Sequence, residues 1–157
     1  LFRSPFKINE LFASLQDGLK LRNATVNLEI YRGSELFCGD KAKITEIINE
    51  LIENSIRHNE EKQIQITITA SIVNNPHILE NEYHGNFLQI MLFDDGKGIP
   101  KEKKNWIFLP LNTTSKQGSG LGLFIIKKTL EEMDGFIWEN GVQGVRFNIF
   151  IKNKEIT

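Results

Sequence analysis

Cysteine is nearly absent from this sequence of 157 residues, which contains only Cys38. A single cysteine excludes a disulfide framework and any metal site built from several thiolates. An excess of one charge is also lacking, because 19 basic and 20 acidic residues leave a formal net charge of −1. That balance argues against a protein whose main task is to grip nucleic acid by its phosphates. We therefore expect no nucleic-acid partner.

Long apolar runs are missing too. The sequence has no uninterrupted apolar stretch of about 18 residues, the length that a membrane-spanning helix needs, and it shows no secretory signal peptide. It starts at Leu1 and not at methionine. We therefore expect a single domain over 1–157 that is a piece of a longer protein and lies in the cytoplasm, compatible with a membrane anchor upstream.

The residues that are present have the composition of a globular domain, with 40% hydrophobic and 25% charged residues. Apolar periodicity predicts a helix that begins at Asn9 and further helices over 41–59 and 120–133, the last ending at a C-cap glycine, Gly135. Strands are expected at 6–8, 26–31, 37–38, 64–73, 87–93, 136–138 and 145–151. Segment 74–86 is expected to be an exposed hairpin loop, and 94–118 a loop. Paired strands in the middle and at the end favour an α+β layered sandwich over a doubly wound parallel sheet.

Polar side chains share one face of the predicted helix 41–59. Glu50, Asn54 and Arg57 are spaced so that they lie beside the isoleucine stripe of this helix. Glu50 can accept a proton, Asn54 offers a hard amide oxygen suited to Mg²⁺, and Arg57 with His58 can reach phosphate oxygens. The plainer interpretation, a solvated helix face, stays open on this helix alone.

A carboxylate and two glycines follow the apolar strand 87–93. Asp94 can accept a hydrogen bond from an exocyclic amine, and Gly96 and Gly98 let the backbone lie close to a flat ligand. Ile99 can pack on the face of a ring. The alternative is an ordinary glycine-rich turn.

Spaced glycines also open the helix 120–133. The run Gly118-Ser119-Gly120-Leu121-Gly122 can aim main-chain N–H groups at an anion beside a helix N-terminus. It lacks the Lys-Ser/Thr ending of a Walker loop and does not follow a strand, so alone it is weak evidence for a phosphate site.

Together and in this order, the three motifs resemble the N box and the two glycine boxes of the GHKL ATPase superfamily, which includes DNA gyrase, MutL and the sensor histidine kinases. The details resemble the catalytic domain of a bacterial histidine kinase along essentially the whole chain. Segment 106–111 resembles its F box, and segment 144–149 its terminal strand. The resemblance implies the Bergerat fold, a two-layer sandwich with a mixed sheet and helices on one face.

The resemblance also implies ATP and Mg²⁺ as cofactors. Asn54 would ligate Mg²⁺, and Asp94 would bond the adenine amino group in a pocket shaped by Gly96, Gly98 and Ile99. The resemblance places Arg57 near the γ-phosphate and His58 beside the nucleotide. Gly118, Gly120 and Gly122 would hold the phosphates, and Leu121 would belong to the same nucleotide-binding run. Phe108 would anchor a lid over roughly 100–118.

Glu50 stands where many histidine kinases have Asn, and its implied role is general base or orienter of the attacking group. Neither His58, His77 nor His84 has the surroundings of a phosphoacceptor. The resemblance therefore implies transfer of the γ-phosphoryl group of ATP to a histidine on a separate dimerisation domain of the same or a partner chain. A response regulator would act downstream, and the isolated domain would be monomeric. Three alternatives remain, namely a GHKL-type ATPase or switch, an anti-sigma-factor-type serine kinase, and a non-catalytic scaffold.

Overall fold

The protein is described here by a computed structural model that covers residues 2–13, 15, 24–110 and 122–154. A five-stranded sheet with the order β2-β4-β7-β9-β8 forms its centre. Its strands are β2 (Ala24–Ile30), β4 (Ile64–Asn74), β7 (Asn86–Asp94), β8 (Gly135–Glu139) and β9 (Arg146–Lys152). The strands β2 and β4 run parallel and the other neighbours antiparallel, so the sheet is mixed.

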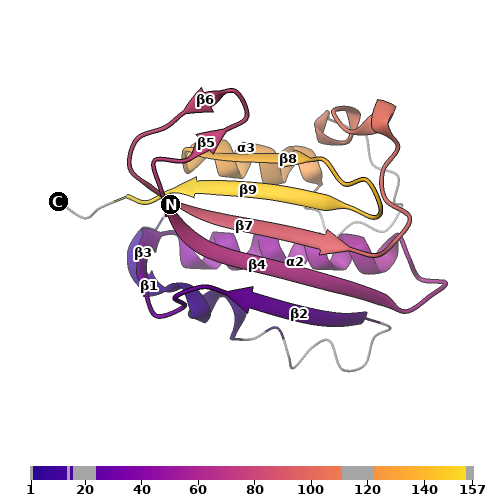
Figure 1. Ribbon diagram of the computed structural model, residues 1–157, viewed down its shortest axis with the longest axis horizontal. Helices are drawn as coiled ribbons and strands as arrows, with labels where there is room; N and C mark the ends of the chain where they lie inside the picture. Colours follow the sequence, from indigo (N-terminus) through magenta and orange to yellow (C-terminus); the bar gives the residue numbers. More distant parts are fainter. Residues whose placement is uncertain (1, 14, 16–23, 111–121, 155–157) are drawn as a thin grey trace.

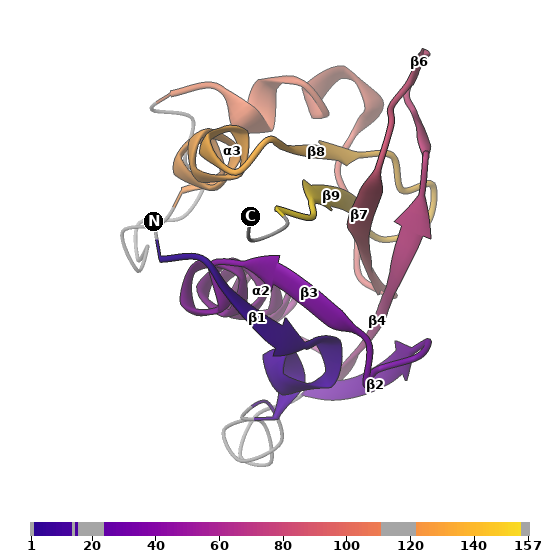
Figure 2. The ribbon, with the colours of Figure 1, turned by 90° about the vertical axis from the view of Figure 1, so that its left-hand side faces the viewer.

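Two helices, α2 (Lys41–Arg57) and α3 (Leu123–Glu132), cover one face of this sheet. They lie behind the strands in Figure 1, and the quarter turn in Figure 2 shows helices and sheet as separate layers. The predicted α+β two-layer sandwich, with a mixed sheet and helices on one face, is therefore confirmed.

Helix α2 is stabilised by an N-cap and by a buried stripe of isoleucines. The side chain of Asp40 caps its start by accepting the N–H of Lys43 at 3.1 Å. Its isoleucine stripe, including Ile44, Ile48 and Ile52, is almost fully buried against the sheet. The tertiary contacts of this stripe offset the weak helix propensity of β-branched residues.

The helix ends at Arg57, two residues earlier than the sequence pattern predicts. Asn59 accounts for the difference, because its side-chain amide donates to the carbonyl of Ser55 at 2.7 Å. Its side-chain oxygen accepts the N–H of Lys97 at 3.1 Å. Asn59 thus satisfies a carbonyl of the last turn of α2 and ties the helix to the turn that follows β7.

A small antiparallel pair, β1 (Ser4–Lys7) and β3 (Leu36–Gly39), leads into α2. The helix that the sequence predicts from Asn9 is observed as a short 3-10 helix, η1 (Ile8–Phe12). The predicted helix continued to about Leu19, and residues 14 and 16–23 lie outside the described part of the chain. In the segment expected to be a loop after β7, two 3-10 helices occur, η2 (Lys101–Lys103) and η3 (Trp106–Phe108).

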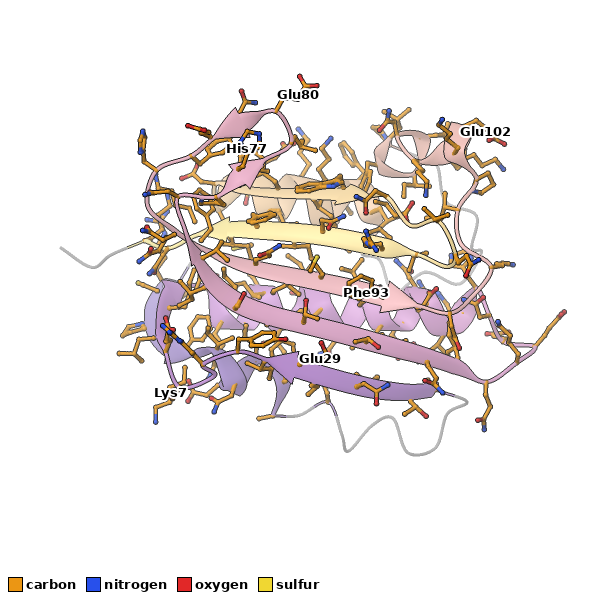
Figure 3. All side chains as sticks on the ribbon, in the orientation of Figure 1. Lys7, Glu29, His77, Glu80, Phe93 and Glu102 are labelled. Atoms are coloured by element: carbon orange, nitrogen blue, oxygen red, sulfur yellow. The ribbon has the colours of Figure 1, made fainter. Side chains whose placement is uncertain are left out.

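The expectation of an exposed hairpin loop over 74–86 was only partly right. Its two short strands, β5 (His77–Ile78) and β6 (Asn81–Glu82), do form a hairpin. However, the side chain of Ile78 is 1% exposed and belongs to a second apolar cluster with Phe87 and Phe150. Figure 3 shows His77 and Glu80 on this hairpin, at the opposite end of β8 from Glu102 on η2.

The C-cap prediction for α3 was one residue off. Gly135 opens β8, and the residue with positive φ after the helix is Asp134, at 51°. An aspartate tolerates this left-handed conformation better than most residues with a side chain. Glycine is needed at 135 for another reason: an added Cβ would lie 2.8 Å from the carbonyl oxygen of Phe150.

Candidate functional site

A cavity of about 310 Å³ opens between the C-terminal end of α2 and the segment that follows β7. Five residues predicted from the sequence line it, namely Asn54, His58, Asp94, Gly98 and Ile99. The fold therefore brings the helix motif and the first glycine motif together, although about 40 residues of sequence separate them.

Asp94 ends strand β7 and is 6% exposed. One carboxylate oxygen, Oδ1, accepts the N–H groups of Gly96 and Val145, each at 3.0 Å. The other, Oδ2, is buried without a hydrogen-bond partner among the described residues. A buried polar atom without a partner is costly and points to a missing ligand or water. Because Asp94 lines the cavity, Oδ2 is an acceptor suited to a donor group of a bound ligand.

Glycines make the close packing around this carboxylate possible. Gly144 has a φ of +79°, and an added Cβ would lie 1.9 Å from the carbonyl oxygen of Asp94. Gly98 has a φ of +70°, and an added Cβ would lie 3.0 Å from the carbonyl oxygen of Gly144. At Gly96 an added Cβ would lie 2.4 Å from Oδ1 of Asn59. Gly96 therefore allows close contact with Asn59 but does not line the cavity. Gly98 allows close contact with Gly144 and also lines the cavity.

Asn54 and Arg57 are in direct contact on α2. Nη2 of Arg57 donates a hydrogen bond to the side-chain oxygen of Asn54. Nε of Arg57 is buried with no partner among the described residues. The amide oxygen of Asn54 is a hard donor that fits Mg²⁺, provided that Arg57 first releases it.

The described residues contain no group of three or more His, Cys, Asp or Glu side chains placed to hold a metal. A Mg²⁺ ion held at Asn54 would therefore find no cluster of carboxylates among the described residues, and phosphate and water oxygens would be needed as further ligands. That pattern is usual for Mg²⁺ that arrives with a nucleotide.

Glu50 lies one helical turn before Asn54 and is 7% exposed. Burial raises the pKa of its carboxyl above the ordinary 4.5, and the positive charge of Arg57 partly opposes this shift. Neither Glu50 nor Arg57 is among the residues that line the cavity. Both lie on α2 close to Asn54, Arg57 through its hydrogen bond to the Asn54 side chain and Glu50 one turn earlier along the helix.

His58 caps the end of α2 and lines the cavity. Burial lowers the pKa of its imidazole below the ordinary 6.5, and the nearby charges of Lys97 and Arg57 lower it further. The Asp94 carboxylate acts in the opposite direction. The imidazole is therefore mostly neutral at pH 7.

The remaining predicted residues differ in position. Phe108 is buried and packs edge-on against Phe147, with 6.4 Å between ring centroids, but it does not line the cavity. Gly122 is the N-cap of α3, and a Cβ added there would meet nothing within 4 Å. Gly118, Gly120 and Leu121 lie outside the described residues.

Sequence reasoning missed several residues that line the cavity. Ser55 follows Asn54, and its hydroxyl oxygen is buried without a partner among the described residues. The rest of the lining consists of apolar side chains, two lysines and one asparagine. The apolar and aromatic residues are Pro100, Trp106, Ile107, Leu123, Val145 and Phe147, and the polar ones are Lys97, Lys103 and Asn59. A serine within the buried stripe of α2 was a usable signal for Ser55, whereas no local pattern marks Val145 or Phe147.

Residues 39–155 match the family described as "Histidine kinase-, DNA gyrase B-, and HSP90-like ATPase". The chain belongs to this ATPase family. Among curated proteins it is similar to the sensor protein kinase WalK of Staphylococcus haemolyticus, with 31% identity over 119 residues. It is also similar to the sensor protein kinase PilS of Pseudomonas aeruginosa, with 25% identity over 113 residues. Each alignment covers 71% of this chain but only 18% of WalK and 20% of PilS, so the chain spans about a fifth of these relatives.

Solved structures of the family have the same fold. The catalytic domain of the histidine kinase ThkA has a TM-score of 0.79 and 26% identity, covering 98% of this chain and 97% of that one. Full-length ShkA, solved in complex with AMPPNP, has a TM-score of 0.79 at 18% identity, covering 100% of this chain and 32% of ShkA. The latter similarity concerns the fold alone.

These comparisons confirm the resemblance to the catalytic domain of sensor histidine kinases. They also confirm ATP as the cofactor that the family implies. In the described part of the chain, no helix has the length and apolar character needed to cross a bilayer.

Proposed function

We propose that this domain binds Mg-ATP and transfers the γ-phosphoryl group to a histidine on a separate dimerisation domain, in two-component signalling. The observation that carries the proposal is Oδ2 of Asp94, a buried acceptor without a partner among the described residues, on a residue that lines the cavity. The relatives WalK and PilS, named sensor protein kinases, support the kinase part.

The residues that line the cavity suggest how it would bind adenine. Oδ2 of Asp94 accepts a hydrogen bond from the exocyclic amino group, and the Ser55 hydroxyl is available to donate to a ring nitrogen. Ile99, Val145 and Phe147 provide apolar surface for the ring. A site of this kind discriminates against guanine, whose carbonyl would face the Asp94 carboxylate.

The phosphate end uses positive charge and an amide oxygen. Lys97 and Lys103 line the cavity and can neutralise phosphate oxygens, and Arg57 becomes available when it leaves Asn54. Asn54 would hold Mg²⁺, which neutralises charge that develops during phosphoryl transfer. The phosphate contacts of Gly118, Gly120, Leu121 and Gly122 remain predictions.

Glu50 would act on the attacking group. Its raised pKa suits a group that takes up a proton or orients a nucleophile. Its position one helical turn before Asn54 keeps it near the proposed metal ligand. In a kinase the attacking group is an imidazole nitrogen of the acceptor histidine. If the attacking group were water, the same carboxylate would support ATP hydrolysis, which is the second candidate function.

The partners follow from the proposed reaction. The acceptor domain belongs to the same or to a partner chain, and a response regulator receives the phosphoryl group next. A solved complex of the histidine kinase ThkA with the response regulator protein TrrA supports a response regulator as partner. A cytoplasmic location and a monomeric isolated domain remain predictions.

A direct experiment mixes the purified chain with Mg-ATP and a histidine-containing dimerisation domain. Acid-labile phosphate on the partner supports the kinase, whereas steady phosphate release without the partner supports the ATPase. Asn54→Ala should remove the Mg²⁺-dependent part of ATP binding, while the matched variant Asn81→Ala, on the exposed hairpin, should not. Normal Mg-ATP binding by Asn54→Ala would contradict the metal assignment.

A further inference from the structure

An ion pair joins two segments that lie far apart in the sequence. The ammonium group of Lys104, just after η2, contacts the carboxylate oxygen Oε1 of Glu139 at the end of β8. The same ammonium donates to the carbonyl oxygen of Gly141 at 2.9 Å. The side chain of Glu139 is 0% exposed and that of Lys104 is 20% exposed. The pair is therefore largely shielded from water, and losing either partner would leave the other charge buried without compensation.

The second oxygen of Glu139 builds the turn between β8 and β9. Oε2 accepts the N–H of Gly141 at 2.6 Å and that of Arg146 at 2.9 Å. Val145, the neighbour of Arg146, donates its own N–H to Asp94 at 3.0 Å. One turn thus connects the Glu139 carboxylate with the Asp94 carboxylate in the cavity.

The segment 100–109, here called the wall segment, forms one side of the cavity. Pro100, Lys103, Trp106 and Ile107 of this segment line it. Lys104 does not, and instead borders a second hollow together with Gly141, whereas Pro100 borders both. The wall segment therefore contributes both to the lining of the cavity and to the ion pair.

Main-chain hydrogen bonds within the wall segment are local. The N–H of Lys103 bonds to Pro100 at 2.9 Å, and the N–H of Leu109 bonds to Trp106 at 3.0 Å. Such bonds give the segment its turns but do not fix its distance from the sheet. The contacts of Lys104 cross to the sheet, as does the packing of Phe108 against Phe147.

We propose that Lys104 and Glu139 are positioning residues that hold the wall segment against the β8–β9 turn and thereby set the shape of the nucleotide pocket. This inference rests on the proposed function, because the pocket is taken to bind ATP. Neither side chain contacts the ligand. Their effect passes through the wall segment on one side and through Val145 to Asp94 on the other.

The test compares Lys104→Met, Glu139→Gln and the double variant with the parent chain. Lys101→Met is the matched control, because Lys101 is exposed on η2, which directly precedes Lys104, and borders the second hollow but not the cavity. Affinity for AMPPNP with Mg²⁺ is measured by calorimetry. Amide hydrogen exchange of residues 103–109 is measured without nucleotide.

We expect each single variant to weaken nucleotide binding by about tenfold, and the double variant to weaken it by less than the product of the two, because contacting residues couple. Exchange in the wall segment should accelerate in Lys104→Met and stay at the parental rate in Lys101→Met. Lys104→Arg should restore most of both properties. Glu139→Gln keeps one side-chain oxygen that can accept the N–H groups of Gly141 and Arg146, so it remains informative if Lys104→Met fails to fold.

Parental exchange and affinity in both Lys104→Met and Glu139→Gln would overturn the proposal, as would equal losses in Lys101→Met. A lower melting temperature with unchanged affinity and exchange would show a merely structural pair and would also overturn it. If the parent chain bound no nucleotide, the proposed function would fail. The exchange comparison would still decide whether the pair holds the wall segment.

Discussion

Asp94 and Val145 are joined by two hydrogen bonds that run in opposite directions. The N–H of Val145 donates to Oδ1 of Asp94 at 3.0 Å, and the N–H of Asp94 donates to the carbonyl of Val145 at 3.2 Å. The first bond fixes the carboxylate by one oxygen. The second oxygen, Oδ2, is consequently left for a ligand, and the site's preference for adenine should depend on it.

Asp94→Asn tests this directly. The amide oxygen can still accept the N–H groups of Gly96 and Val145, so the fold should survive with a small change in melting temperature. The amide nitrogen then replaces Oδ2 and faces the adenine amino group, two donors against each other. An unsatisfied buried donor costs about 1–3 kcal/mol, so ATP affinity measured by calorimetry should fall roughly 10- to 100-fold. Unchanged affinity would contradict the role of Asp94.

Gly144→Ala should be far more harmful than an alanine at another glycine with positive φ. The new Cβ at position 144 would lie 1.9 Å from the Asp94 carbonyl oxygen. Gly85→Ala is the control, because Gly85 has a φ of +95° but nothing within 4 Å of an added Cβ. Denaturant unfolding should show a loss of about 1 kcal/mol for Gly85→Ala and of more than about 3 kcal/mol for Gly144→Ala. Equal losses would show that backbone strain alone accounts for both.

His58 should make stability depend on pH in a defined direction. Because the folded-state pKa of His58 is lowered below 6.5, the unfolded chain binds a proton more readily than the folded chain. Its contribution to stability is therefore present above pH 6.5 and is lost as the pH falls below that value. The free energy of unfolding, measured in urea at pH 7.5 and at pH 5.5, should differ less between the two pH values for His58→Gln than for the parent. His77→Gln, on the exposed hairpin, should retain the parental difference.

Glu50→Gln should separate catalysis from binding. Glu50 does not line the cavity, so ATP affinity should change less than about threefold, while phosphoryl transfer should fall by about 100-fold or more, the usual contribution of a general base. The raised pKa of Glu50 also predicts that transfer declines as the pH falls through a value above 4.5, because the carboxylate form is lost. Calorimetry and single-turnover transfer at several pH values would check both points. A parental transfer rate in Glu50→Gln would remove Glu50 from the mechanism.

Much of the fold could be predicted from the sequence because its signals are local. The isoleucine spacing in α2 and the alternation in β4 each identify an element and its buried face. Asp94 could be predicted as a site residue because it follows an apolar strand and precedes two glycines. The predicted end of α2 was wrong by two residues. The helix stops where the Asn59 side chain contacts Ser55 and Lys97, and hydrophobic periodicity does not reveal such contacts.

The residues that sequence reasoning missed depend on contacts between distant segments. Val145 lies 51 residues from Asp94, and Lys104 lies 35 residues from Glu139. Their roles appear only when β7, β8 and β9 are side by side in one sheet. The contact of Arg57 with Asn54 is local, but the spacing of the two residues gives no sign of which hydrogen bond forms.

The hairpin 74–86 should stabilise the fold without affecting the nucleotide site. Ile78 is 1% exposed beside Phe87 and Phe150, so Ile78→Ala should cost about 2–5 kcal/mol of unfolding free energy, as other large-to-small core substitutions do. Leu79→Ala is the matched control, since Leu79 is 61% exposed at the tip, and it should cost less than about 0.5 kcal/mol. Because the hairpin and η2 lie at opposite ends of β8 (Figure 3), both variants that remain folded should bind ATP with parental affinity. A loss of ATP affinity in folded Ile78→Ala would show that the hairpin communicates with the cavity through the sheet.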